Sequence, residues 1–241
     1  MGGKRVSVVM PVYNEREYIS EIIKRVMATG IPDEIIAVDD ASTDGTSGIL
    51  DGIKEGWDGR ACALTVLRHG KNSGKGASVR LGVRHAAGDI IIIQDADLEY
   101  DPRDYEKLLW PIVEGKADVV YGSRFMGWGK GVRSFLHMSG NRALTVFSNV
   151  LAGVSLSDME TGYKVFRAGV IKGIDIESDR FDLEPEITAK VARRGFRIEE
   201  TPISYAGRTY REGKKIKWKD GVAALWHIVR FNLFGKDGTV R

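Results

Sequence analysis

The sequence has almost no cysteine and no long apolar run. Cys62 is the single cysteine among 241 residues, which excludes an internal disulfide and predicts a reducing compartment. No stretch approaches the roughly 20 apolar residues of a membrane-spanning helix. The apolar run that begins at Val6 ends at Pro11 and is too short for a secretory signal. We therefore expect neither a leader peptide nor a membrane span.

The chain also has little net charge. Its 36 Lys and Arg residues nearly balance its 33 Asp and Glu residues, which leaves a net charge of +3. This charge is too small to imply nucleic acid by itself, and no nucleic-acid partner is expected. The basic residues gather instead between Arg208 and Lys219, just before an apolar tail.

Short apolar runs alternate with amphipathic patterns in the first half of the chain. This alternation predicts an α/β fold with a mostly parallel, doubly wound sheet flanked by helices. Strands are expected at 6–12, 34–40, 61–67, 90–94, 117–121, 163–166 and 197–205. Helices are expected at 15–28, about 43–55, 76–87, 102–114, 141–151 and 184–194. The Gly-rich segment 122–131 is expected to be a loop over the site, 1–210 a single domain and 211–241 a C-terminal extension.

The segment from Asp89 to Glu99 is the most informative part of the sequence. Four consecutive isoleucines predict a strand buried on both faces, as in the middle of a parallel sheet. Asp95 and Asp97 follow at its carboxyl end, where parallel sheets bind ligands. Two carboxylates in one crevice repel each other unless a cation lies between them, and oxygen ligands favour Mg²⁺ or Mn²⁺. We interpret the pair as a cation site for a nucleotide diphosphate, with a solvated acidic turn as the alternative.

Polar clusters also follow two earlier strands, as Pro11-Val-Tyr13-Asn-Glu15 and as Val38-Asp-Asp40-Ala-Ser-Thr-Asp44. Each cluster alone is equally well explained by turn chemistry and helix capping. On one edge of one sheet, however, they predict a ligand site. The basic loop 70–76 lacks the Ser or Thr of a phosphate-binding loop, because Gly76 stands there, so it could border a phosphate or form a plain turn.

Taken together, these clusters resemble the motifs of family-2 glycosyltransferases. Further motifs are similar to the dolichyl-phosphate mannose synthase branch, which uses polyprenyl phosphates: Gly122-Ser-Arg124-Phe, Asp158-Met-Glu-Thr-Gly162-Tyr-Lys-Val-Phe166, Phe181-Asp-Leu-Glu184 and Pro202-Ile-Ser-Tyr205. With these motifs the resemblance covers nearly the whole chain. It implies a GT-A-type fold and transfer, with inversion, of mannose or glucose from a nucleotide diphosphate sugar, such as GDP-mannose or UDP-glucose, to a polyprenyl or dolichyl phosphate.

The resemblance also implies roles for individual residues. The nucleotide-sugar site would comprise Pro11, Tyr13, Glu15, Val38, Asp40, Asp95, Ala96, Arg208 and Lys215. Asp97 and Glu99, the latter where close relatives often have Gln, would bind Mg²⁺ or Mn²⁺. Asp95, Asp97 and Arg124 would be catalytic, and Arg124 and Arg133 would bind the acceptor phosphate.

The nature of the acceptor decides whether a general base is needed. A phosphate is already anionic near neutral pH and needs only positioning. A saccharide or protein hydroxyl would require a carboxylate base, with Asp158, Asp182 and Glu184 as candidates, although caps and ion pairs explain these residues equally well. A sugar nucleotidyltransferase is a more distant alternative, because Tyr13-Asn14-Glu15 stands where a basic, glycine-rich loop is needed.

Apolar residues recur at helical spacing near the C-terminus: Ile216, Trp218, Val222, Leu225, Trp226 and Val229. Four lysines, at 214, 215, 217 and 219, lie at the start of this segment. Such a helix can lie on an anionic membrane surface, or it can pack on the core and expose a basic face. We expect a cytoplasmic protein that contacts the membrane, or a membrane-protein partner, peripherally.

Overall fold

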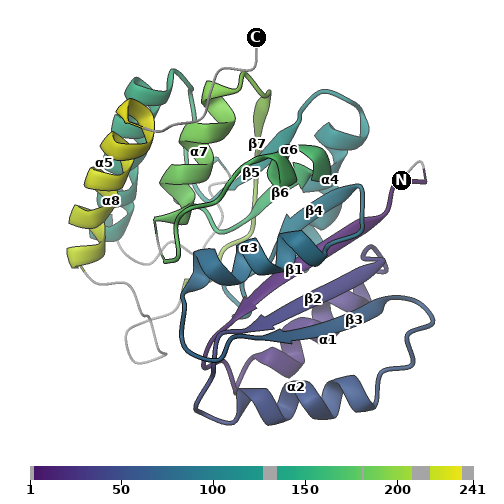
Figure 1. Ribbon diagram of the computed structural model, residues 1–241. Coiled ribbons are helices and arrows are strands. Elements are labelled where there is room, and N and C mark those ends of the chain that lie inside the picture. The colour runs from purple at the N-terminus through teal and green to yellow at the C-terminus, as the bar shows by residue number, and fades with distance from the viewer. Residues whose placement is uncertain (1–2, 127–134, 181, 208–217, 235–241) are drawn as a thin grey trace.

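The computed structural model describes residues 3–126, 135–180, 182–207 and 218–234 (Figure 1). Its sheet has seven strands in the order β3-β2-β1-β4-β6-β5-β7. The strands are β1 Val6–Val12, β2 Glu34–Asp39, β3 Ala63–Arg68, β4 Ile90–Ile93, β5 Val119–Ser123, β6 Lys164–Arg167 and β7 Ile198–Pro202. All neighbouring strands pair in parallel except β6, which is antiparallel to both β4 and β5. The prediction of a mostly parallel α/β sheet is confirmed.

Helices cover both faces of the sheet (Figure 1). One face carries α1 Ile19–Ala28, α2 Thr46–Glu55, the 3-10 helix η1 Pro102–Asp104 and α4 Tyr105–Val113. The other carries α3 Lys75–His85, α6 Ala168–Gly173 and α7 Leu183–Arg193. Helices α5 Phe135–Ala152 and α8 Trp218–Leu233 lie side by side and pack against α7. Among the described residues, none of the helices is long and apolar enough to cross a membrane.

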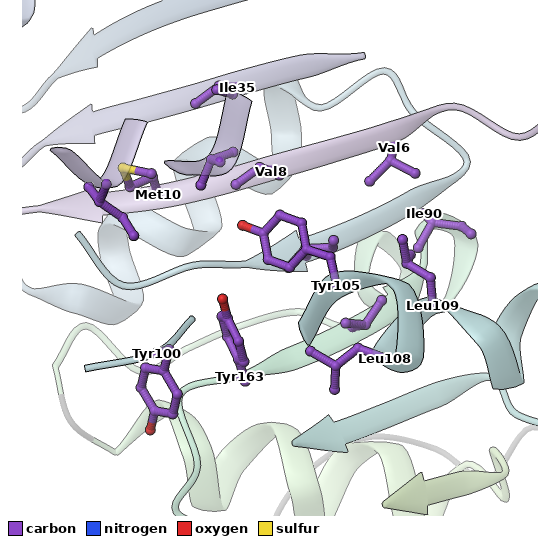
Figure 2. Close-up of a cluster of buried hydrophobic side chains, with 14 of the residues drawn as sticks. Val6, Val8, Met10, Ile35, Ile90, Tyr100, Tyr105, Leu108, Leu109 and Tyr163 are labelled. Carbon is purple, nitrogen blue, oxygen red and sulfur yellow. The ribbon is translucent and has the colours of Figure 1, made fainter. Parts of the chain in front are cut away.

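Alternation along the strands divides the core between the two faces. In β4, Ile90 and Ile92 pack with α1 and α4, whereas Ile91 and Ile93 pack with α3 and α6, because successive side chains of a strand point to opposite faces. Figure 2 shows the α4 side of this core, where Tyr105 and Tyr163 lie among aliphatic side chains. The predicted strand buried on both faces is confirmed.

The surroundings of β4 differ from those of a fully parallel sheet. β4 pairs in parallel with β1 but antiparallel with β6, the one antiparallel strand in the described part of the mostly parallel sheet. The chain leaves β5, forms α5 and enters β6 from the carboxyl edge of β4. This reversal brings 158–163 to the edge where the ligand site was expected.

Most other differences concern the ends of elements. The predicted loop 122–131 begins too early, because Gly122 and Ser123 extend β5 by pairing with Thr201 and Pro202 of β7; its last residues, 127–131, lie outside the described residues. Helix α1 begins at Ile19 rather than at residue 15, since a turn precedes it. Helix α6 was not predicted, because its six residues are too few to show a helical period.

Candidate active site

The carboxyl ends of β1 and β2 are joined by hydrogen bonds. The backbone N–H of Asn14 donates to Ser42 Oγ over 2.9 Å, and the N–H of Thr43 donates to Asn14 Oδ1 over 2.8 Å. Asn14 and Ala41 have positive φ angles of 52° and 57°. Ala41 thus adopts a left-handed conformation that favours glycine. The two polar clusters share one edge, as predicted.

Asp40 connects this edge to the basic loop 70–76. Its two carboxylate oxygens accept hydrogen bonds from the N–H groups of Ser73 and Gly74, each over 2.7 Å. Gly74 has a φ of 101°, and a Cβ there would lie 2.2 Å from the carbonyl oxygen of Asp179, so only glycine fits. Two N–H groups of the loop are therefore occupied by Asp40.

Lys75 lies between two carboxylates at the first turn of α3. Its Nζ is 2.8 Å from Asp95 Oδ1 and 3.1 Å from Glu184 Oε1. Burial opposes the charge of Lys75, but Asp95 and Glu184 outweigh it and hold the pKa of the amine well above its usual range. Lys75 was predicted only as part of the basic loop 70–76 and not as a site residue of its own. The available signal was a lysine flanked by glycines at a helix start, but its carboxylate partners lie far along the chain.

Gly162 forms a backbone wall beside Asp95. Its N–H donates to Tyr100 Oη over 2.8 Å. A Cβ at this position would lie 2.3 Å from Asp95 Oδ2 and 3.0 Å from the Tyr100 ring. The absence of a side chain at Gly162 therefore lets the loop before β6 approach Asp95 closely.

Arg124 is held by a buried bidentate ion pair just after β5. Its Nε and Nη2 donate to the two oxygens of Asp158, each over 2.7 Å, and its backbone N–H donates to Asp158 Oδ2 over 3.0 Å. Asp158 is fully buried, and the Arg124 side chain is 10% exposed. The guanidinium also lies 5.2 Å from the Tyr205 ring centroid. Asp158 is thus engaged as the counter-ion of Arg124.

The remaining candidate bases are also engaged. Glu184 pairs with Lys75, as described above. Asp182 precedes α7, accepts the N–H of Arg180 over 3.2 Å and lies 3.5 Å from His227 Nδ1. The interpretation of these acids as ion-pair partners fits these contacts, whereas Asp182, at the N-cap of α7, makes no side-chain cap hydrogen bond within the described residues.

Asp97 and Glu99 follow β4 as a pair of carboxylates. The Glu99 N–H donates to Asp97 Oδ1 over 3.1 Å, and the Tyr205 hydroxyl donates to Glu99 Oε2 over 2.8 Å. Within the described residues there is no group of three or more acids, histidines or cysteines arranged as a complete metal site. Two carboxylates nevertheless suit Mg²⁺ or Mn²⁺, because such ions usually take further ligands from phosphate and water. The residues present therefore fit a cation that arrives with a nucleotide diphosphate.

The other predicted residues differ in their accessibility. Pro11 and Val38 are register partners across β1 and β2, but Val38 is fully buried and faces α3, so the structure does not expose it to a ligand. Ala96 is likewise part of the core. Tyr13 is half-buried, and Glu15 is buried with its N–H donating to Thr46 Oγ1. Arg133, Arg208 and Lys215 lie outside the described residues.

Comparison with known sequences identifies relatives over most of the chain. A family model described as "Glycosyl transferase family 2" matches residues 7–174. An undecaprenyl-phosphate mannosyltransferase of Micrococcus luteus is 29% identical over 256 residues, which cover 95% of this chain and 99% of that protein. A dolichol-phosphate mannosyltransferase of Pyrococcus furiosus is 29% identical over 231 residues, which cover 94% of this chain and 63% of that protein.

Solved structures share the fold at lower identity. Glucosyl-3-phosphoglycerate synthase from Mycobacterium tuberculosis, in complex with Mn²⁺, UDP and phosphoglyceric acid, matches with a TM-score of 0.71 and 17% identity, covering 95% of this chain and 77% of that one. Mannosyl-3-phosphoglycerate synthase from Rubrobacter xylanophilus matches with a TM-score of 0.72 and 20% identity, covering 99% and 77%. At these identities the likeness is one of fold.

Proposed function

We propose that this chain, which belongs to glycosyl transferase family 2, moves mannose or glucose from a nucleotide diphosphate sugar to a polyprenyl phosphate. The observation that carries this proposal is that the two acids predicted as bases near the donor site, Asp158 and Glu184, are paired with Arg124 and Lys75. A hydroxyl acceptor needs a carboxylate able to take its proton, whereas a phosphate acceptor is already anionic. The names of the Micrococcus and Pyrococcus relatives point to the same acceptor.

Each group at the site has a role in such a transfer. Asp97 and Glu99 would hold Mg²⁺ or Mn²⁺, which when bound neutralises the charge of the diphosphate leaving group. Lys75 fixes the orientation of Asp95 beside Gly162, where Asp95 would contact the donor. The acceptor phosphate would attack the anomeric carbon directly, so the configuration there would invert.

Arg124 retains donors for a phosphate although it is paired. A guanidinium has five N–H donors, and Asp158 takes one from Nε and one from Nη2. Three donors remain, and they would serve the acceptor phosphate. Because Asp158 fixes the plane of the guanidinium, these donors are oriented before the phosphate binds.

An exposed apolar surface supports a lipid acceptor. Helix α8 buries Ile228 and Phe231 against α7, so the expectation that it packs on the core fits the structure. The same helix exposes Leu225 and Trp226, and neighbouring α5 exposes Val146 and Val150, with Trp226 61% and Val150 74% exposed. We propose that this apolar surface of α5 and α8 contacts the membrane that carries the acceptor.

Transfer can be tested directly with the purified protein, Mn²⁺ and labelled GDP-mannose or UDP-glucose. One arm contains a polyprenyl phosphate in detergent, and the other contains 3-phosphoglycerate or free saccharides. We expect an organic-soluble, acid-labile product in the first arm only. Asp97→Asn should abolish its formation, whereas the matched change of the exposed Asp58→Asn should not. Product confined to the second arm would refute the lipid acceptor.

A further inference from the structure

Glu160 lies at the site, although no role was assigned to it above. It belongs to the loop before β6, two residues after Asp158 and two residues before Gly162. Gly162 lies against Asp95, which would contact the donor, and Asp158 pairs with Arg124, which would bind the acceptor phosphate. The antiparallel direction of β6 is what brings this loop to the carboxyl edge of β4.

One oxygen of the Glu160 carboxyl group is buried without a hydrogen-bond partner in the described part of the chain. Its Oε1 is shielded from solvent and has no hydrogen-bond partner among the described residues. The nearby cation Lys164 is engaged elsewhere, since its Nζ donates to the carbonyl oxygens of Met159 and Thr161 and lies 4.5 Å from the Tyr121 ring centroid. A buried polar atom without a partner costs free energy of folding.

Charged groups on several elements face this carboxyl. They are Glu184 on α7, Lys164 on β6, Arg124 after β5 and Asp158 in the same loop. Burial and the charge of Glu184 raise the pKa of Glu160 to about 7, against the opposing effect of Lys164 and Arg124. Glutamine would fill the same space without a buried charge, so the presence of an acid here points to a ligand that donates a hydrogen bond to the accessible oxygen of the carboxyl group.

The surroundings restrict the chemistry of that ligand. A phosphate oxygen placed against the Glu160 carboxylate would be repelled by it and by Glu184, and the acceptor phosphate has the free donors of Arg124 instead. A sugar hydroxyl, in contrast, is a neutral donor, and a carboxylate is its strongest acceptor. The Glu160 side chain is half-buried as a whole, and its terminal torsion is soft, so either oxygen can turn toward a ligand.

We infer that Glu160 accepts a hydrogen bond from a hydroxyl group of the sugar being transferred, and thereby contributes to the choice of donor sugar. This inference rests on the proposed function, because it requires a nucleotide sugar at the site. It assigns Glu160 to the sugar moiety and leaves the nucleotide and its diphosphate to other residues.

Calorimetric titration separates the sugar from the rest of the donor. The wild type, Glu160→Ala and Glu160→Gln are titrated, with Mn²⁺, against GDP-mannose and GDP and against UDP-glucose and UDP. For the sugar nucleotide that the wild type binds, Glu160→Ala should weaken affinity roughly tenfold, as expected for loss of one hydrogen bond to a charged group. Affinity for the matched diphosphate should stay within roughly twofold, while Glu160→Gln, which keeps an acceptor oxygen, should lose less.

The controls distinguish the possible failures. Glu199→Ala, at an exposed position on β7, should change neither affinity. Equal losses for sugar nucleotide and diphosphate would place Glu160 at the diphosphate, and unchanged affinities would place it outside the donor site; either result overturns the inference alone. Loss of turnover in Glu160→Gln with unchanged sugar affinity would make it a proton acceptor instead. A wild type that binds none of the four nucleotides would refute the proposed function and the inference together.

Discussion

Along the ligand edge, the ends of β1 and β2 are held by hydrogen bonds to backbone N–H groups, whereas the ends of β4 and β5 are held by buried ion pairs. On the first side, Asp40 binds the N–H groups of Ser73 and Gly74. On the second side, Arg124 pairs with Asp158, 34 residues away, and Lys75 pairs with Glu184, 109 residues away. The first side thus depends on loop geometry, and the second on a balance of buried charges.

This difference has consequences for substitution. The hydrogen bonds to backbone N–H groups can be lost singly, and near the surface a water molecule can replace the lost partner. A buried ion pair that loses one partner leaves a full charge without compensation. The same chemical change should therefore have a larger effect on the side of β4 and β5.

Asp158→Asn should have the largest effect on stability. The substitution keeps the shape of the side chain but leaves the Arg124 guanidinium, which is 10% exposed, without a counter-charge. We expect the free energy of unfolding to fall by about 3 kcal/mol. Urea denaturation followed by circular dichroism measures this change. Glu21→Gln, which removes a partner of the exposed Arg25, should leave the midpoint unchanged; an equal loss in both variants would contradict the importance of burial.

Gly162→Ala should mainly affect catalysis. The added methyl group would lie 2.3 Å from Asp95 Oδ2 and would push this carboxylate away from Lys75. A displacement of about 1 Å at a reacting centre can cost about 100-fold in rate, and we expect kcat/KM for the donor to fall by that order. Activity close to that of the wild type would show that Asp95 need not hold its position beside the loop.

The side of β1 and β2 was the easier one to predict from sequence. Parallel strands with buried runs of Val and Ile can be predicted from a short stretch of sequence, and the turn residues that follow them indicate the ligand edge. Asp40 was found in this way, although its contacts with Ser73 and Gly74 were not. Those contacts depend on the three-dimensional course of a loop more than thirty residues later, which has no local signal.

The side of β4 and β5 was predictable only in part. Asp95 and Asp97 stood out because two acids follow an apolar strand. Lys75 did not, because its role arises where its side chain, at the start of α3, meets Asp95 and Glu184 in space. The strand at 163–166 was predicted, but its antiparallel direction was not, since the order and direction of strands are set by long-range packing that four residues cannot reveal. Glu160 lies at the site only because β6 runs antiparallel to β4.

Asp40→Asn should destabilise less than Asp158→Asn. An amide in place of the carboxylate keeps one acceptor but turns an NH₂ group toward the N–H of Ser73 or Gly74. We expect a loss of about 2 kcal/mol in the free energy of unfolding, the range for a hydrogen bond to a charged group. Hydrogen exchange of the Ser73 and Gly74 amides should accelerate. A loss exceeding that of Asp158→Asn would reverse the proposed difference between the two sides.

Glu160→Gln should change how the stability of the protein depends on pH. The pKa of Glu160 is about 7 in the folded protein, above its ordinary 4.5. Because the folded state holds this proton more tightly than the unfolded state, the contribution to stability is full below pH 4.5 and is lost as the pH rises through 7. The glutamine variant should match the wild type near pH 4.5 and be more stable at pH 8, because the buried charge is gone. Thermal midpoints between pH 4.5 and 8 measure this gap. A constant gap would show that Glu160 does not titrate there.

Gly52→Ala should have the smallest effect, and of the opposite sign to Gly162→Ala. Gly52 lies in α2, is exposed, and has open space where a Cβ would be. Alanine favours the helix and restricts the unfolded chain, so the free energy of unfolding should rise by about 0.5–1 kcal/mol. Donor kcat/KM should not change, because α2 contributes no side chain to the buried ion pairs. Both variants add one methyl group. Opposite outcomes would therefore show that the loss of activity in Gly162→Ala comes from the close approach of the loop before β6 to Asp95. A comparable loss of activity in both would mean that the site responds to the helices outside the sheet as strongly as to its own buried charges.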